Sequence, residues 1–348
     1  MDPLWRMIYT DKKGGNILMF GEKFATRLNS FASKPHIFWK NEIPLITTDK
    51  LIERAGTVKG LTDLDLNYPD HAGDNLDHIL KVIQDNGLGV NGFAMRYYTN
   101  PAFKLGAFTN PDKRVRQEAI DLTKEGIDAA RKLNVNLMTI WLGQDGFDYG
   151  FQANYKKLWQ DEIDGIQEIA LHDKECQISI EYKPNEPRAY SLLSNLSSTL
   201  LAIKEIDLSN LGVTLDFAHI LYADEQPAFS AAMVSRNSKI LGLHLNDGYG
   251  KRDDGLMVGS VHQLATIELL YQVYKDGYDG TIFFDTFPDA SGLDPVKECE
   301  TNIRTVKTML KVVKKLSDDN NLLQAMENQD AVTSNKIFNK ALYNLNSD

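Results

Sequence analysis

Short apolar runs alternate with segments of helical spacing along most of this chain. In residues 75–87, for example, Leu76, Ile79, Leu80 and Ile83 recur at the spacing of one helix face. Further helices are predicted near residues 111–133, 190–206, 225–237, 260–275 and 293–316. Strands are predicted at residues 24–32, 58–67, 88–95, 136–143, 177–184, 212–219, 240–247 and 281–288. This alternation is typical of an α/β protein in which helices connect parallel strands.

Eight alternations without a linker rich in Gly, Pro or Ser favour one barrel over two domains. We therefore predict a single (β/α)8 TIM barrel in residues 1–317. After residue 317 the chain is polar, has helical propensity and carries too few apolar residues to form a core alone. Residues 318–348 are predicted to be a C-terminal helical extension, either a solvated tail or an arm that packs on another subunit.

The last four predicted strands each end in a side chain that can bind a metal ion. These side chains are Glu181, Asp216, His244 and Asp285. They are spaced by roughly 30 to 40 residues, which is the length of one crossover unit. Parallel strands would bring all four to the carboxyl edge of the barrel, where barrel enzymes have their active sites. Three carboxylates and an imidazole suit Mg²⁺, Mn²⁺ or Co²⁺ better than a thiolate-type zinc site does, so we predict a divalent metal site.

Further ligands follow two of these strands. His219 lies three residues after Asp216, and the glycine-rich loop after the third of the strands carries Asp247, Asp253 and Asp254. Paired carboxylates near a histidine can hold a second ion and deprotonate its bound water. A lone carboxylate at a strand end is more often a helix cap, and a lone histidine is more often a capping or core residue. These residues therefore predict either a binding site for a second ion or a loop in which they only cap helices and turns.

Lys183 has the most distinctive position. It stands two residues beyond Glu181 and therefore on the same face of an extended strand. A lysine beside a metal-bound carbonyl group can stabilise the negative charge that develops on the oxygen. Pro184 and Pro187 would fix the loop that follows. Trp141, in the fourth predicted strand, is by its type alone a packing residue.

Composition and net charge limit the kinds of molecule that this protein is expected to bind. The 348 residues are 43% hydrophobic and 25% charged, as in soluble globular proteins, and the formal net charge is −10. That charge argues against a nucleic acid, and against phosphorylated substrates unless a local basic pocket is present. No stretch predicts a transmembrane helix, and the first residues lack the pattern of a secretory signal. Cys176 and Cys299 make neither a disulfide framework nor a zinc cluster, so we expect a cytoplasmic protein without a membrane partner.

Three segments resemble the xylose isomerase family and its rhamnose-isomerase-like relatives. EYKPNEPR at residues 181–188 is close to the family signature EPKPNEPR, with Tyr182 in place of proline. FKLGAFTNPDKRVRQEA at residues 103–119 is similar to FKDGGFTSNDRDVRRYA, and IWLGQDG around Trp141 is similar to AWGGREG. The first motif is highly specific. The resemblance extends from about residue 90 to residue 290 and fades on both sides.

This resemblance implies two metal ions. A structural ion that binds two substrate hydroxyls would have four ligands, which are Glu181, Asp216, His244 and Asp285. His244 replaces an aspartate of xylose isomerases, as it does in the rhamnose-isomerase-like enzymes. A mobile catalytic ion would be held by Asp216, His219 and Asp253, with Asp254 as a further candidate.

The resemblance also implies a reaction and a quaternary structure. Lys183 would polarise the carbonyl oxygen, and Trp141 would form a wall of the apolar channel in which a hydride moves between C1 and C2. The implied activity is metal-dependent aldose–ketose isomerisation of a free, unphosphorylated sugar. The family is typically a homotetramer with a C-terminal arm, so we expect a dimer or tetramer.

Two departures from the family pattern leave other functions open. Gly255 stands where a third carboxylate of the second ion is expected, and the ring-opening His-Asp pair is replaced by a segment with Asp70 and His71. The departures argue against D-xylose as the substrate. One alternative is a ketose 3-epimerase of the same barrel superfamily, although Asp285 stands where those enzymes have a second glutamate. The other is a sugar-binding barrel without catalytic activity.

Overall fold

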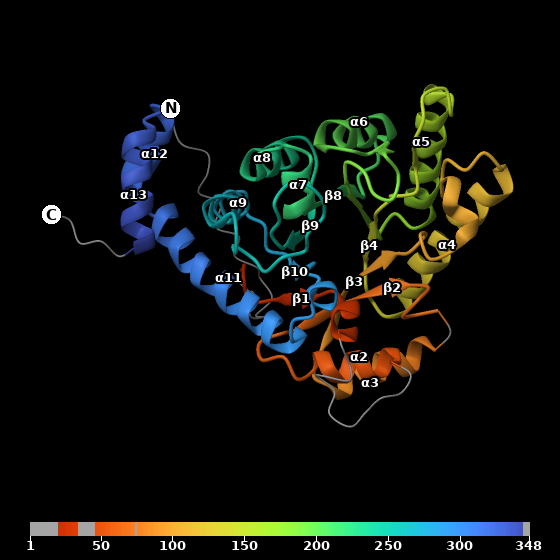
Figure 1. Cartoon of the computed structure of the whole chain (residues 1–348), viewed down its shortest axis with the longest axis horizontal. Helices are drawn as coiled ribbons and strands as arrows, with labels where there is room; N and C mark the ends of the chain where they lie inside the picture. Colours follow the sequence, from red (N-terminus) through yellow and green to blue (C-terminus); the bar gives the residue numbers. More distant parts are fainter. Residues whose placement is uncertain (1–19, 34–45, 74, 344–348) are drawn as a thin grey trace.

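The computed structural model describes residues 20–33, 46–73 and 75–343, and its centre is one sheet of eight parallel strands (Figure 1). The strands are β1 (Phe24–Thr26), β2 (Asp63–Tyr68), β3 (Gly89–Met95), β4 (Leu137–Ile140), β6 (Gln177–Glu181), β8 (Leu211–Asp216), β9 (Ile240–Leu245) and β10 (Ile282–Phe284). Their order in the sheet is β1-β10-β9-β8-β6-β4-β3-β2. Strands that follow one another along the chain in this sheet are therefore neighbours.

The two edge strands of this sheet meet and close the barrel. Arg27, directly after β1, forms a parallel bridge with Asp65 of β2. The Thr62 N–H donates to the Phe24 carbonyl oxygen at 3.0 Å, and the Phe24 N–H donates to Thr62 Oγ1 at 2.9 Å. The predicted single (β/α)8 barrel is therefore confirmed.

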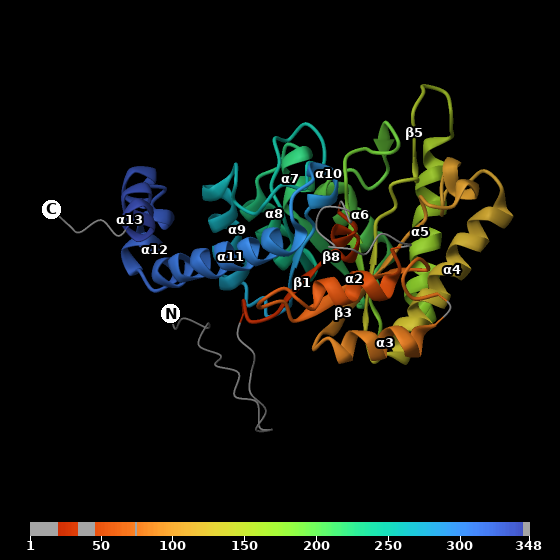
Figure 2. The same cartoon turned by 60° about the horizontal axis from the view of Figure 1, so that its bottom comes forward.

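Helices surround the strands (Figures 1 and 2). The longer ones are α2 (Thr48–Ala55), α3 (Leu76–Asp85), α4 (Lys113–Lys132), α5 (Tyr155–His172), α6 (Leu196–Ile206), α8 (Pro227–Asn237), α9 (Gln263–Lys275) and α11 (Pro295–Ser317). Two short helices, α7 (Phe217–Tyr222) and α10 (Pro288–Ser291), follow β8 and β10. The loops after β4 and β6 pair through two short antiparallel strands, β5 (Gly146–Phe147) and β7 (Tyr190–Ser191).

Two helices extend the chain beyond the barrel. In both views α12 (Asn320–Glu327) and α13 (Ala331–Tyr343) lie at the far end of α11, away from the strands (Figures 1 and 2). Leu322 and Ala325 of α12 are buried, whereas α13 has no fully buried residue. The helical extension is thus confirmed, and its contact with another subunit stays a prediction.

No helix among the described residues is long and apolar enough to span a membrane. Residues 1–19, which include the start of the chain, lie outside them.

Several details of the predicted pattern were wrong. The strand predicted at residues 24–32 ends at Thr26, and Leu28–Ala32 is a 3-10 helix, since Leu28 and Phe31 are buried at a helical spacing. Helix α5 was missed, although it begins at an Asn154 cap and buries Ile163 and Ile166 at a helical spacing. The helix predicted at residues 190–206 begins only at Leu196, where Asn195 forms a capping box.

Candidate metal centre and sugar pocket

The four predicted ligands of the first ion meet at the carboxyl edge of the barrel. Glu181 and Asp216 are the last residues of β6 and β8, His244 lies near the end of β9, and Asp285 follows β10. In the sheet register Asp216 is the partner of His244. One ligand atom from each of the four residues lies within 4.8 Å of the others. Four strands therefore assemble one compact cluster that can hold a divalent ion.

Asp216 is held in place by its own helix and by Asn246. It caps the N-terminus of α7, where the His219 N–H donates to Asp216 Oδ1 at 3.0 Å. Asn246 Nδ2 donates to both Asp216 oxygens at 3.2 and 3.1 Å, and to the Asp285 carbonyl oxygen at 3.1 Å. Asn246 Oδ1 accepts from the Ala218 N–H at 2.8 Å. The sequence prediction missed Asn246, a fully buried residue that orients one ligand of the cluster.

Polar atoms without partners indicate that a cation fits this cluster. His219 Nδ1 and His244 Nδ1 are buried and make no hydrogen bond within the part of the chain that the structure describes. They lie 3.5 and 3.4 Å from Glu181 Oε1. His244 Nδ1, which belongs to the cluster, faces these carboxylates without a hydrogen bond and is a ready metal ligand. The cluster therefore fits the predicted hard or borderline divalent ion.

The charges of the cluster support the same interpretation. Burial alone would lower the pKa of His244, but Glu181, Asp285 and Asp216 outweigh it and raise this pKa to about 9. Burial raises the pKa of Asp216 to about 7. Burial opposes ionisation of Glu181 as well, yet His244 and His219 beside it lower its pKa to about 2. The carboxylates thus require positive charge nearby, and a divalent ion supplies it in place of protons.

Lys183, His219 and Asp253 form a second group beside the first. Lys183 Nζ donates to Asp253 Oδ2 at 3.1 Å, and His219 Nε2 lies 3.1 Å from the same oxygen. Lys183 Nζ also lies 2.9 Å from Glu186 Oε2. Burial lowers the pKa of Lys183, but Asp253 and Glu186 outweigh it, and this pKa lies above its ordinary value. Lys183 is therefore an ammonium group at neutral pH, which donates hydrogen bonds rather than removing protons.

Asp254 and Asp247 lie on the same loop as Asp253 but belong to neither group. Asp254 Oδ2 accepts from the Tyr249 N–H, and its Oδ1 accepts from Arg252 Nε, both at 2.8 Å. Asp247 Oδ2 accepts from two N–H groups just before α9, both at 2.8 Å. Both carboxylates therefore hold the loop in shape, and the structure does not bring Asp254 to the other predicted ligands.

A cavity of about 250 Å³ lies beside the two groups. Its lining includes the side chains of both groups except Asp216, together with Arg27, Asp65, Asn67, Arg96, Tyr98, Trp141, Phe283 and Phe287. The Trp141 ring forms part of the wall, with its centre 5.0 Å from Lys183 Nζ and 5.7 Å from the centre of the Tyr98 ring. This size allows a single small molecule, and the mixture of aromatic faces and polar groups is typical of a ligand pocket.

Two arginines of the cavity were not singled out in the sequence. Arg27 Nη1 lies 2.9 Å from Asp289 Oδ1, so this guanidinium already has a carboxylate partner. The Arg96 guanidinium stacks over the Tyr98 ring at 5.7 Å, and its Nε is buried without a hydrogen-bond acceptor among the described residues. Arg96 is therefore available to a ligand in the cavity.

His71 does not replace the missing ring-opening pair. Its Nδ1 accepts from the Asn67 N–H at 3.1 Å, so its Nε2 carries the proton and donates to Asn29 Oδ1 at 2.8 Å. Burial, together with Arg96 and Arg27, lowers the pKa of His71 to about 3. The imidazole is thus neutral with both nitrogens engaged, and it is not part of the cavity lining.

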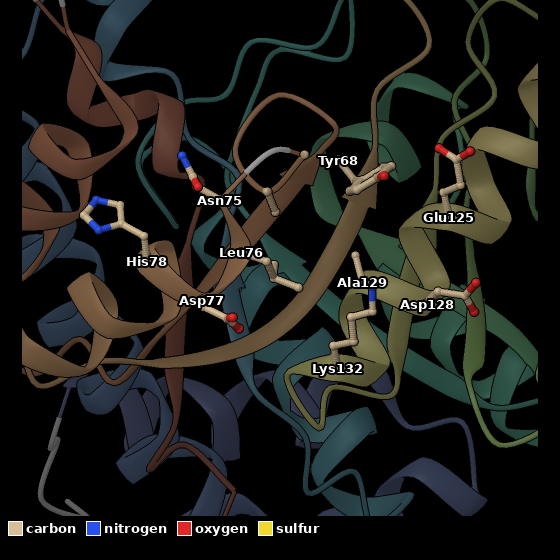
Figure 3. Close-up of a pocket in the computed structure, with 11 residues that line it drawn as sticks. Tyr68, Asn75, Leu76, Asp77, His78, Glu125, Asp128, Ala129 and Lys132 are labelled. Atoms are coloured by element: carbon tan, nitrogen blue, oxygen red, sulfur yellow. The ribbon is translucent and has the colours of Figure 1, made fainter.

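A larger cavity of about 490 Å³ lies on the outside of the barrel, between α3 and α4 (Figure 3). Two of its ionisable groups, His78 and Asp128, pair with residues of neighbouring helices. His78 Nε2 lies 2.7 Å from Asp49 Oδ2, and Asp128 Oδ1 lies 2.8 Å from His172 Nε2. None of the predicted metal ligands lines this cavity, so we place the candidate site in the smaller one.

Comparison with known proteins agrees with the barrel fold. The sequence model of the xylose isomerase-like TIM barrel family matches residues 55–312. The chain belongs to this family. The xylose isomerase of Thermus thermophilus is 27% identical over 252 residues, which is 70% of this chain and 65% of that protein. The chain therefore spans somewhat less than two thirds of the length of this curated relative.

Solved structures of the same fold include sugar epimerases. A D-tagatose 3-epimerase-like protein is similar with a TM-score of 0.62 and 18% identity, covering 84% of this chain and 98% of its own. An L-ribulose 3-epimerase is similar with a TM-score of 0.65 and 14% identity, covering 85% and 96%. At these identities the similarity shows the fold alone.

Proposed function

We propose that this protein is a metal-dependent aldose–ketose isomerase that acts on a free sugar. The observation that carries the proposal is the Lys183 ammonium group, which lies in the wall of the cavity, 5.0 Å from the Trp141 ring and beside the carboxylate–imidazole cluster. A fixed cation next to a metal centre is suited to a reaction that builds negative charge on a carbonyl oxygen. The Thermus thermophilus protein named xylose isomerase supports the same reaction class.

The chemistry divides between the ion and the side chains. Glu181, Asp216, His244 and Asp285 would hold a divalent ion such as Mn²⁺, Mg²⁺ or Co²⁺, which when bound would supply positive charge and Lewis-acid polarisation to the sugar oxygens. Lys183 donates a hydrogen bond to O1 of the open-chain aldose. The C2–H bond breaks with its electron pair, which forms a new C1–H bond, and the proton of the O2 hydroxyl moves to O1. Trp141 limits the access of water to the reacting carbons.

Ketose 3-epimerisation is the second candidate, and the solved structures of similar fold favour it. In that reaction two carboxylates of a single-ion site exchange the proton at C3 from opposite faces of the sugar. Glu181 and Asp285 both belong to the cluster. Asp285 is one methylene shorter than the glutamate of those enzymes, and Lys183 has no evident task in a proton exchange. We therefore prefer the isomerase.

The remaining expectations concern the cellular location, the quaternary structure and the domain boundary. We propose that the chain is cytoplasmic and forms a homo-oligomer, a dimer or tetramer, through residues 318–348. We keep residue 317 as the boundary between the catalytic barrel and the C-terminal arm, because α11 ends there.

An assay for turnover tests the proposed reaction class. The purified protein is loaded with Mn²⁺ and offered a panel of aldoses and ketoses, and the products are separated by chromatography. Formation of a ketose from at least one aldose, lost after removal of the ion with EDTA, is the expected result. Sugar binding without conversion of any sugar would instead support the barrel without catalytic activity.

A further inference from the structure

The second metal ion that the family resemblance implies does not fit this chain. Gly255 stands at the position of one expected carboxylate. Its φ of +55° is strained for a residue with a side chain, and a Cβ atom there would lie 2.3 Å from Phe287 Cδ2. The Phe287 N–H donates to the Gly255 carbonyl oxygen at 2.8 Å, and the Arg27 guanidinium lies 4.9 Å from the centre of the Phe287 ring. An aromatic ring therefore fills the place of the missing ligand.

The other carboxylates near this position are engaged elsewhere. Both oxygens of Asp254 accept hydrogen bonds within their own loop. Asp216, the residue that would have to bridge two ions, receives three hydrogen bonds from the His219 N–H and Asn246 Nδ2. It is also one methylene shorter than a glutamate, which limits its reach toward a second ion. Of the predicted second set only His219 and Asp253 remain.

Two basic side chains of this protein, Lys183 and His219, already contact Asp253. Its Oδ2 is shared by Lys183 Nζ and His219 Nε2, both at 3.1 Å. The Lys183 and Asp253 side chains are 7% and 9% exposed, so this ion pair is shielded from water. A buried ammonium group needs such a partner, because an unpaired charge would be costly there.

We propose that this chain binds one divalent ion, and that Asp253 is the counter-ion that positions Lys183 and His219 rather than a metal ligand. The inference rests on the proposed metal-dependent function, but it concerns the number of ions and not the sugar reaction. Lys183 then supplies the positive charge that a second ion would otherwise place beside the carbonyl oxygen.

The test counts the ions bound to the full chain without any sugar. Metal-free wild-type protein is titrated with Mn²⁺, and the bound ion is measured by calorimetry and by elemental analysis after dialysis. Two variants form a matched pair, because each changes one buried carboxylate to its amide: Asp253→Asn and Asp285→Asn. Circular dichroism and the melting temperature confirm that each variant is folded.

We expect one Mn²⁺ per wild-type chain and one per Asp253→Asn chain with an affinity within about threefold, whereas Asp285→Asn weakens binding at least about tenfold. Two ions per wild-type chain would overturn the proposal, and so would loss or marked weakening of the single ion in Asp253→Asn. Because Asp253 positions Lys183 in this proposal, we also expect kcat to fall in Asp253→Asn while the bound ion is retained. Absence of turnover with every sugar would refute the proposed function without changing the ion count.

Discussion

Lys183 Nζ lies 3.1 Å from Asp253 Oδ2, and this pair joins the strand-end motif of β6 to the glycine-rich loop after β9. Seventy residues separate the two side chains in the sequence. Because Asp253 and Glu186 outweigh the effect of burial, the pKa of Lys183 lies above its ordinary value. The pair therefore fixes both the position and the charge of the group that faces the cavity.

Replacing Lys183 by Met should abolish turnover and leave the metal bound. Methionine keeps most of the volume of the side chain but cannot donate a hydrogen bond to the carbonyl oxygen, so a fall in kcat of at least about 10² is expected. Steady-state kinetics and a Mn²⁺ titration measure the two properties separately. Lys251→Met, at an exposed position on the neighbouring loop, is the control and should behave as wild type. Retained turnover in Lys183→Met would refute the role given to this residue.

Removing the side chain of Asn246 should weaken metal binding although Asn246 is not a ligand. Asn246→Ala loses the donor to both Asp216 oxygens, and we expect the dissociation constant for Mn²⁺ to rise about 10- to 100-fold. Asn246→Asp keeps the acceptor for the Ala218 N–H but faces Asp216 with a like charge, so its loss should be larger. Unchanged affinity in both variants, with the melting temperature intact, would show that Asp216 needs no such support.

Arg96 is expected to donate a hydrogen bond to the bound sugar. Its side chain lines the cavity, and its Nε has no acceptor among the described residues. A hydrogen bond from a charged donor contributes about 1.5–3 kcal/mol, so Arg96→Met should raise KM about 10- to 100-fold with a smaller change in kcat. The exposed Arg114 gives a control variant, Arg114→Met, for the same steady-state measurement. An unaltered KM in Arg96→Met would remove Arg96 from the binding site.

Glu162 makes the stability of the protein depend on pH. Both of its oxygens are buried without hydrogen-bond partners in the described chain, and burial, with Asp145 nearby, raises its pKa well above the ordinary value. The folded protein therefore holds this proton more tightly than the unfolded one. Its stabilising effect is complete below the ordinary carboxyl pKa and declines as pH rises above it.

Glu162→Gln removes this titration and should stabilise the protein at pH 8 by about 1–3 kcal/mol relative to wild type, with little difference at pH 4. Urea unfolding at a series of pH values gives the comparison. A wild-type curve with the same slope as that of Glu162→Gln would show that Glu162 does not titrate in the folded state.

The sequence was sufficient to predict the barrel and the meeting of the four candidate ligands, because both follow from local patterns. Each of Glu181, Asp216 and His244 stands at or near the end of an apolar run, and the spacing of the runs gives parallel strands whose ends meet. Helix α5 also carried a signal, with Ile163, Ile166 and Ile169 at a helical spacing, which was not recognised.

Other parts of the site depend on contacts that no local pattern records. The Phe287 ring covers Gly255, and the two residues lie on different loops. Arg96 follows a strand, where an arginine is most often a surface residue, and only the closed barrel turns it toward the cavity. The neutral state of His71 likewise depends on burial and on the nearby Arg96 and Arg27, which come together only after folding.

The most direct test of the proposed function follows the hydrogen atoms of the sugar. The reaction is run in D₂O with Mn²⁺, the ion is then removed by chelation, and the products are analysed by NMR. Aldose–ketose conversion in which the hydrogen of C2 appears at C1 with little deuterium is the result that a hydride-transferring isomerase predicts. Deuterium at C3 of a ketose, with inversion at that carbon, would contradict it and identify the protein as a 3-epimerase.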